Sequence, residues 1–179
     1  IAGIASPINF MLEPTALADI INGSGAKILV AYDDDEGFGI WDKVEKIRNR
    51  LTTIEKILCI RQAAHTKPAK SATGIEDFDK AHQNFNAAAL DFDPNLNRDD
   101  TAFFVHTGGT TGVPKLAKVT HVAILFKTWS TPAMQGLLND EVLFGAAPLF
   151  HIGGVEPTSA VPFANGMTIV IPGTLGFRN

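Results

Sequence analysis

One stretch decides the fold of this chain: His106-Thr107-Gly108-Gly109-Thr110-Thr111-Gly112-Val113-Pro114-Lys115. Its glycines and threonines leave too few apolar side chains to fill a core, so we expect a loop. Residues 101–105 before it are rich in β-branched and aromatic side chains, which predicts a short buried strand. An apolar pattern resumes from about Thr120 and predicts a helix. The loop should therefore join a strand to a helix at the carboxyl edge of a sheet, where open α/β sheets bind ligands.

The residue types of this loop suit a phosphate group. Glycines let backbone N–H groups approach an anion closely, and threonine hydroxyls and a lysine ammonium add further donors. The composition alone is equally compatible with a mobile surface loop. Spacing excludes a Walker loop, in which lysine follows glycine directly, and also the three-glycine dinucleotide fingerprint. We predict a nucleotide-phosphate site made of Thr107, Gly108, Gly109, Thr110, Thr111, Gly112 and Lys115.

The stretch closely resembles the signature T-S-G-T-T-G-x-P-K-G of the adenylate-forming enzymes. These include acyl-CoA synthetases, luciferases and the adenylation domains of peptide synthetases. Gly108 replaces the common serine, a variant found in the acyl-CoA synthetase branch. Leu116 replaces the closing glycine, which leaves the backbone after the lysine with less conformational freedom.

A second patch, Leu149-Phe150-His151-Ile152-Gly153-Gly154, resembles the P-L-F/Y-H-x-x-G segment of acyl-CoA synthetases, which lies beside the carboxylate substrate. A lone histidine at a strand end is usually structural. Two matches in the family's order favour a functional one. The resemblance implies that His151 orients or gates the substrate, and that Gly153 and Gly154 keep the pocket wall open.

The resemblance also implies a reaction. A carboxylate attacks the α-phosphorus of ATP, pyrophosphate leaves, and coenzyme A then takes the acyl group. Lys115, Thr111 and His151 would be the catalytic residues, with Thr110 among the phosphate donors and Thr107 touching Mg²⁺. The implied enzyme is a fatty acyl-CoA synthetase. The alternatives are another adenylating branch, or a nucleotide- or phosphate-binding α/β module without chemistry.

Composition narrows the class of protein. The chain has 179 residues, 45% of them apolar and 19% charged, with a net charge of −4. Scattered basic residues give no nucleic-acid face, and no apolar run is long enough to cross a bilayer. The single cysteine, Cys59, lies in an apolar run and is predicted to be a core residue. We expect a cytoplasmic protein whose partners are a carboxylic acid, ATP and CoA; the sequence does not indicate an oligomeric state.

The order of elements predicts an α/β fold, a mostly parallel sheet with helices on both faces. A helix starts at Pro14 and ends at residues 22–25, and buried parallel strands follow at 26–32 and 56–60. The acidic run 33–36 is interpreted as a solvated loop before a helix, because it lacks calcium-loop spacing. That helix carries an amphipathic stripe: Ile40, Val44, Ile47, Leu51 and Ile54.

Later segments continue the alternation. Residues 61–98 are predicted to be a long surface connection, within which 75–80 resembles a short helix of the family. Thr120 suits an N-cap, and Pro132 should kink or restart the helix that follows. Strands are predicted at 141–148 and 167–172, each ending in a proline, with a short helix over 155–165. The apolar face of the helix after Thr120 comprises Val122, Leu125, Phe126 and Trp129.

Two portions of one larger domain follow from this order, residues 1–98 and residues 99–179. The matched motifs cover a middle part of the large N-terminal domain of adenylate-forming enzymes. The family's ribose-binding Thr-Gly-Asp and its C-terminal domain are absent from the sequence. We therefore expect a fragment of that domain which, by itself, is inactive.

Overall fold

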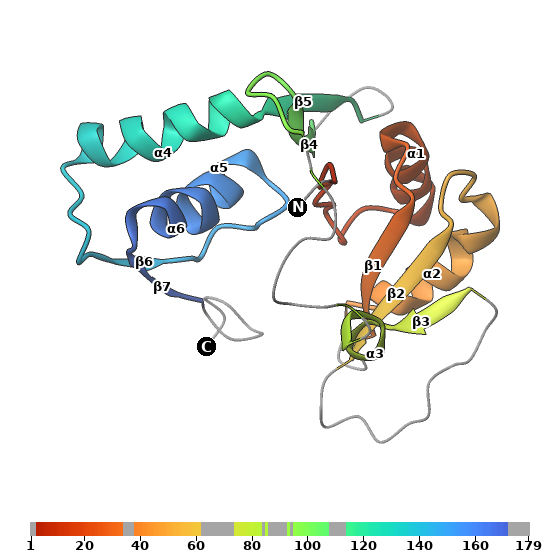
Figure 1. Cartoon of the computed structure of the whole chain (residues 1–179). Helices are drawn as coiled ribbons and strands as arrows, with labels where there is room; N and C mark the ends of the chain where they lie inside the picture. The colour runs from red at the N-terminus through yellow and green to blue at the C-terminus, as the bar shows by residue number, and fades with distance from the viewer. Residues whose placement is uncertain are drawn as a thin grey trace. The chain divides into compact units, whose positions relative to one another are not determined.

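The computed structural model describes residues 3–33, 38–61, 74–83, 85, 93, 95–107 and 114–171. These residues form two compact units, whose elements are labelled in Figure 1. The α1–α3 unit contains the described residues of 9–93 together with Pro114 and Lys115. The β4–β7 unit contains residues 3–8, 95–107 and 116–171.

The α1–α3 unit is built on a parallel sheet. Its strands β1 (Ile28–Asp33), β2 (Lys56–Arg61) and β3 (Ile75–Asp77) lie in that order. Helix α2 (Ile40–Ile47) packs on this sheet, and the shared core comprises Ala31, Trp41, Val44, Ile57 and Cys59. The predicted parallel pairing is confirmed. The prediction that the first strand is buried holds for one face, because Ile28 and Val30 on the other face are 55% and 46% exposed.

Helix α1 (Pro14–Ser24) begins and ends as the sequence predicts. Pro14 occupies the first turn, where its missing N–H removes no helical hydrogen bond. Gly25 ends the helix in the left-handed region at φ 67°, and its N–H donates to the Asn22 carbonyl at 3.1 Å.

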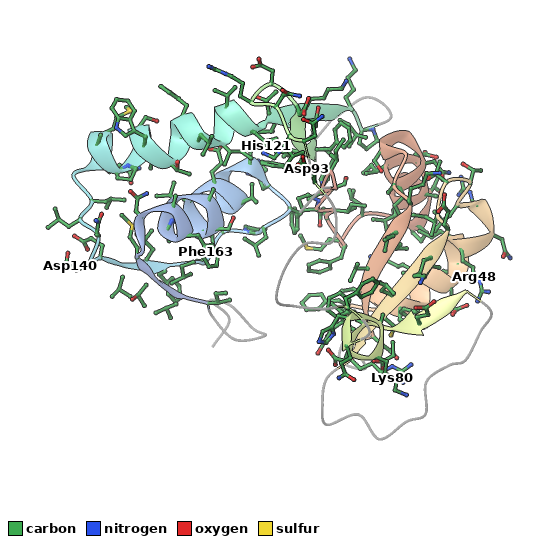
Figure 2. All side chains as sticks on the ribbon, viewed as in Figure 1. Arg48, Lys80, Asp93, His121, Asp140 and Phe163 are labelled. Atoms are coloured by element: carbon green, nitrogen blue, oxygen red, sulfur yellow. The ribbon has the colours of Figure 1, made fainter. Side chains whose placement is uncertain are left out.

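Helix α2 is shorter than its predicted stripe. It ends at Ile47 and passes into the single tight turn η1 (Arg48–Arg50), so Leu51 and Ile54 lie beyond it; Arg48 is labelled in Figure 2. The Asn22 side chain explains the change of direction. Its Nδ2 donates to the Arg50 carbonyl at 2.9 Å, and its Oδ1 accepts from the Thr52 N–H at 2.9 Å. These bonds replace the ones that a longer helix would have made.

The predicted surface connection 61–98 contains regular structure. Strand β3 was not expected there, and helix α3 (Phe78–Gln83) follows it directly. Helix α3 overlaps the short helix expected at 75–80. The exposed ring of His82 on α3 lies 3.1 Å from the Phe78 carbonyl through Nδ1.

A hairpin forms between the predicted strand and the predicted helix. Strand β4 (Thr101–His106) pairs in the antiparallel direction with strand β5 (Leu116–Thr120), and His106 lies opposite Leu116. The strand expected at 101–105 and the helix expected from about Thr120 are both present, but strand β5, which was not expected, lies between the loop and that helix. Leu116, at the position of the family's glycine, starts the new strand, where a leucine side chain packs better than glycine. On the other side of β4, Ala5 forms a parallel bridge to Phe103.

Helix α4 (His121–Gln135) follows β5 without a break. The Thr120 hydroxyl accepts from the Ala123 N–H at 3.3 Å, which confirms the predicted N-cap. The helix continues through Pro132 instead of restarting there. Proline has no N–H to give to the Thr128 carbonyl four residues earlier. The Asn165 side chain supplies that donor through Nδ2, at 2.9 Å.

The face that α4 buries is small and partly polar. Thr128, Ser130 and Pro132 are buried, whereas Phe126 and Trp129 are 60% and 70% exposed. The residues predicted as an apolar face are thus largely exposed within the β4–β7 unit. Small buried side chains let α4 approach its neighbouring helix closely, which the bond between Asn165 and Thr128 requires.

In the remaining part of the β4–β7 unit, strands and helices alternate along the chain as predicted. Strands β6 (Val142–Phe144) and β7 (Thr168–Val170) are parallel. Between them a continuous helical segment runs through α5 (Ile152–Val155), η2 (Glu156–Ala160) and α6 (Val161–Asn165), alongside α4 (Figure 1). Figure 2 labels Phe163 on α6, whose ring is 79% exposed. The α/β class of the chain is confirmed, with parallel pairing in the β1–β3 and β6–β7 sheets and antiparallel pairing between β4 and β5.

Candidate functional site

The predicted phosphate loop lies between two strands in the sequence. Thr107, which follows β4, is exposed, and so is Lys115, which precedes β5. His106 and Leu116, which flank these two residues in the sequence, pair across the hairpin. Five predicted phosphate ligands lie outside the described residues: Gly108, Gly109, Thr110, Thr111 and Gly112. Of the predicted phosphate ligands, Thr107 and Lys115 are thus the two that the structure describes.

The second predicted patch forms a tight turn that enters α5. The His151 N–H donates to the Pro148 carbonyl at 3.1 Å, and the His151 carbonyl accepts from the N–H groups of Gly154 at 2.9 Å and Val155 at 3.0 Å. His151 is the residue that caps the helix, with an extended backbone at φ −110° and ψ 144°. The structure brings His151, Gly153 and Gly154 together in this turn.

The two glycines have different surroundings. Gly154 is buried, and a Cβ atom added there would overlap the carbonyl oxygen of Pro148. Gly153 is exposed, and its added Cβ would lie 3.2 Å from Nδ1 of His151. The close approach of backbone to backbone thus requires glycine at position 154, while Gly153 leaves room beside the imidazole ring.

The ring of His151 has a defined tautomer. Its Nδ1 accepts a hydrogen bond from the Gly153 N–H at 3.0 Å, so Nδ1 carries no proton in this arrangement. In a neutral imidazole the proton then resides on Nε2. Because the residue is exposed, this Nε2–H can donate to an incoming oxygen atom. A carboxylate accepts such a bond and donates none when ionised.

His106 is a candidate site residue that the sequence motifs did not indicate. Its ring stacks on Phe150 with centroids 6.3 Å apart and planes inclined by 20°. Burial lowers the pKa of His106 below its ordinary value, and the nearby His151 lowers it further. His106 directly precedes the glycine-rich loop in the sequence, but its partner lies 44 residues away, so no local pattern indicates the contact.

Metal-binding side chains do not gather among the residues that the structure describes: no group of three or more histidine, cysteine, aspartate or glutamate residues could hold an ion there. Of the acidic run 33–36, Asp33 faces Arg61 with Oδ2 4.0 Å from Nε, and the other three residues lie outside the described ranges. The exposed hydroxyl of Thr107 is an oxygen donor of the type that magnesium accepts.

Cys59 is buried, at 1% exposure. Burial raises the pKa of its thiol above the ordinary value, with Arg61 opposing the shift. A protonated, inaccessible thiol is a poor nucleophile. The interpretation of Cys59 as a core residue is confirmed.

Comparison with known proteins identifies the family. The family described as AMP-binding enzyme matches residues 1–178, almost the entire chain. The chain belongs to the AMP-binding enzyme family. Among solved structures, the anthranilate CoA ligase AuaEII in complex with anthranoyl-AMP superposes with a TM-score of 0.79 at 24% identity, over 96% of this chain and 31% of that one. This likeness shows that the AMP-binding chain shares the fold of that enzyme.

Curated relatives of this AMP-binding chain are CoA ligases. Marinolic acid–CoA ligase of Pseudoalteromonas sp. (strain SANK 73390) is 26% identical over 98% of this chain and 26% of its own length. Crotonobetaine/carnitine–CoA ligase of Shigella dysenteriae serotype 1 (strain Sd197) is 29% identical over 96% of this chain and 31% of its own length. The AMP-binding chain thus spans between a quarter and a third of these relatives.

Proposed function

We propose that this chain is part of the N-terminal domain of a longer acid–thiol ligase. That enzyme joins a carboxylic acid to ATP, releases pyrophosphate, and transfers the acyl group from the adenylate to coenzyme A. Family membership supports the proposal, and so do the CoA ligases among its relatives. The observation that carries it is the turn at His151, where the bond from the Gly153 N–H to Nδ1 leaves the exchangeable proton of this exposed residue on Nε2.

His151 is proposed to bind the acid. Its Nε2–H would donate to one carboxylate oxygen and hold the other toward the α-phosphorus. Positioning of this kind converts an encounter between two molecules into a reaction within one complex. Gly153 and Gly154 would keep the wall beside the ring free of side chains. The carboxylate oxygen forms a bond to phosphorus as the bond to pyrophosphate breaks.

The loop 107–115 is proposed to bind the phosphates of ATP. Negative charge grows on pyrophosphate as it leaves, and donors directed at that charge stabilise the transition state. Lys115 would supply an ammonium group, and Thr110, Thr111 and the glycine N–H groups would supply hydrogen bonds. Thr107 is the residue proposed to touch magnesium, which when bound neutralises phosphate charge. In the second step the CoA thiolate attacks the acyl carbon, and AMP leaves.

The substrate is proposed to be a fatty acid, on the resemblance of Pro148-Leu149-Phe150-His151 to the acyl-CoA synthetase segment. The ligases named above are named for different acids, marinolic acid, crotonobetaine or carnitine, and anthranilate, which supports a carboxylic acid as the class. We propose a cytoplasmic location for the enzyme. No helix within the described part of the chain has the length and apolar character needed to span a membrane.

The experiment that tests this function is acid-dependent exchange of labelled pyrophosphate into ATP. It uses the longer enzyme with a panel of short, long and aromatic acids. We expect exchange with one class of acid and a fall of about 100-fold in Lys115→Ala, the scale for losing a preorganised charge donor. Lys118→Ala on β5 is the matched control, since Lys118 is also exposed but lies outside the loop. ATP binding without exchange for any acid would instead favour a nucleotide-binding module without chemistry.

The 179-residue chain alone is proposed to be inactive, because it spans only between a quarter and a third of the length of the CoA ligases it resembles. Detectable acyl-CoA formation by this chain would contradict that statement.

A further inference from the structure

Two aromatic rings connect the end of β4 to the turn that carries His151. The ring of His106 stacks on the ring of Phe150, with centroids 6.3 Å apart and planes inclined by 20°. His106 immediately precedes Thr107, where the predicted phosphate loop begins, and Phe150 immediately precedes His151. One contact therefore links a residue beside each half of the proposed site.

Both residues belong to segments whose backbones are fixed. Strand β4 is held by β5 on one side, with His106 opposite Leu116. On its other side the Phe104 N–H donates to the Ala5 carbonyl at 2.8 Å. The His151 turn is held by the hydrogen bonds to Pro148, Gly154 and Val155 described above. Since neither backbone can adjust freely, the stack can transmit position from one segment to the other.

We propose that His106 is a positioning residue for His151, acting through its stack on Phe150. The proposal rests on the function proposed above, in which His151 binds the acid and the loop after Thr107 binds ATP. The stack would keep the imidazole of His151 at a constant place relative to the end of β4, and hence the carboxylate in line with the phosphate to be attacked. His106 itself need not touch either substrate.

The chemistry of the ring fits this role. A half-buried imidazole can pack against a phenyl ring in an offset stack, and a centroid distance of 6.3 Å lies within the range of such pairs. Alanine at position 106 would remove this ring contact, whereas phenylalanine would retain an aromatic surface of similar size.

The test compares His106→Phe, His106→Ala and Phe150→Leu in the longer enzyme, with His82→Ala on α3 as the histidine control. Pyrophosphate exchange is measured with acid and ATP varied separately. We expect kcat/KM for the acid to fall about 3- to 10-fold in His106→Ala, the fold-change that corresponds to one aromatic pair. His106→Phe, which keeps a ring, should restore most of that loss, and His82→Ala should match the wild type.

A double variant separates positioning from a general effect on folding. His106→Ala combined with Phe150→Leu should be no worse than the more impaired single variant, because both remove the same contact. Losses that multiply would overturn the proposal, as would a His106→Phe variant as impaired as His106→Ala. An independent readout is the NMR shift of the His106 ring protons, which Phe150→Leu should move and His82→Ala should not.

The outcomes distinguish the two proposals. A wild type without acid-dependent exchange overturns the proposed function, and the positioning role with it. An active wild type whose His106→Ala variant equals His82→Ala overturns the positioning role alone.

Discussion

The Nδ2 group of Asn165 lies 2.9 Å from the carbonyl oxygen of Thr128 and donates the hydrogen bond that Pro132 cannot. Asn165 thus joins α6 to α4 at the point where the hydrogen-bond ladder of α4 is interrupted. The same Nδ2 also bonds to the Val161 carbonyl within its own helix at 2.8 Å. A helix that contains a proline is made continuous by a side chain from its neighbour.

Replacing Asn165 by alanine should lower the free energy of unfolding by about 1 to 3 kcal/mol, the scale for leaving a buried polar group without a partner. Pro132→Ala provides the control background, because alanine restores an N–H to the Thr128 carbonyl. In that background the loss from Asn165→Ala should shrink, as measured by urea denaturation. An equal loss in both backgrounds would show that the bond to Thr128 contributes nothing to the free energy of unfolding.

Gly154→Ala should destabilise the His151 turn, since the new methyl group would overlap the Pro148 carbonyl. Overpacking of this kind costs about 1 to 3 kcal/mol. Gly153→Ala is the comparison: its methyl group meets the imidazole Nδ1 at 3.2 Å and should leave stability nearly intact while raising the KM for the acid. Thermal melts and exchange kinetics separate the two effects. Equal melting temperatures for the wild type and Gly154→Ala would contradict the assignment.

The lowered pKa of His106 gives stability a definite pH dependence. Its folded pKa lies below the ordinary 6.5, through burial first and His151 second. Between the folded pKa and 6.5 the unfolded chain binds the proton more readily, so stability rises with pH in this window. The contribution is complete above 6.5 and is lost as the pH falls through 6.5 toward the folded pKa. His106→Phe should flatten this part of the urea-denaturation profile, and an unchanged slope would rule out His106 as its source.

Cys59 should react with thiol reagents only when its unit opens. It is buried, its thiol pKa is raised, and the chain has no other cysteine to confuse the signal. Labelling of the native chain should therefore be slow and should accelerate with denaturant in parallel with unfolding of the α1–α3 unit. Rapid labelling without denaturant would mean that the thiol is accessible in the native state.

Local chemistry made much of the fold predictable. Pro14 and Gly25 bound α1 because their backbone preferences are decided within a few residues. Thr120 caps α4 for the same reason. The α/β class followed from strands and helices that alternate along the chain.

What could not be predicted depends on distant partners. Strand β5 is short and contains Lys118, and its pairing with β4 is a tertiary contact. The chain turns away after α2 because the Asn22 side chain bonds to backbone groups about 30 positions away in the sequence. The stack of His106 on Phe150 likewise joins two residues that are far apart in the sequence. Within the candidate site, the motif indicated His151 and both glycines. Neither the motif nor the hydrophobic periodicity indicated the contact between the rings of His106 and Phe150.

The burial of Trp41 and the exposure of Trp129 give the chain two internal fluorophores with opposite environments. Trp41 is 3% exposed in the α1–α3 unit and Trp129 is 70% exposed in the β4–β7 unit, and the chain has no third tryptophan. In the folded chain, emission at short wavelength therefore comes from the α1–α3 unit and emission quenched by iodide from the β4–β7 unit. Because Trp41 exchanges a buried environment for water on unfolding, loss of the short-wavelength emission follows unfolding of the α1–α3 unit in the unmodified protein.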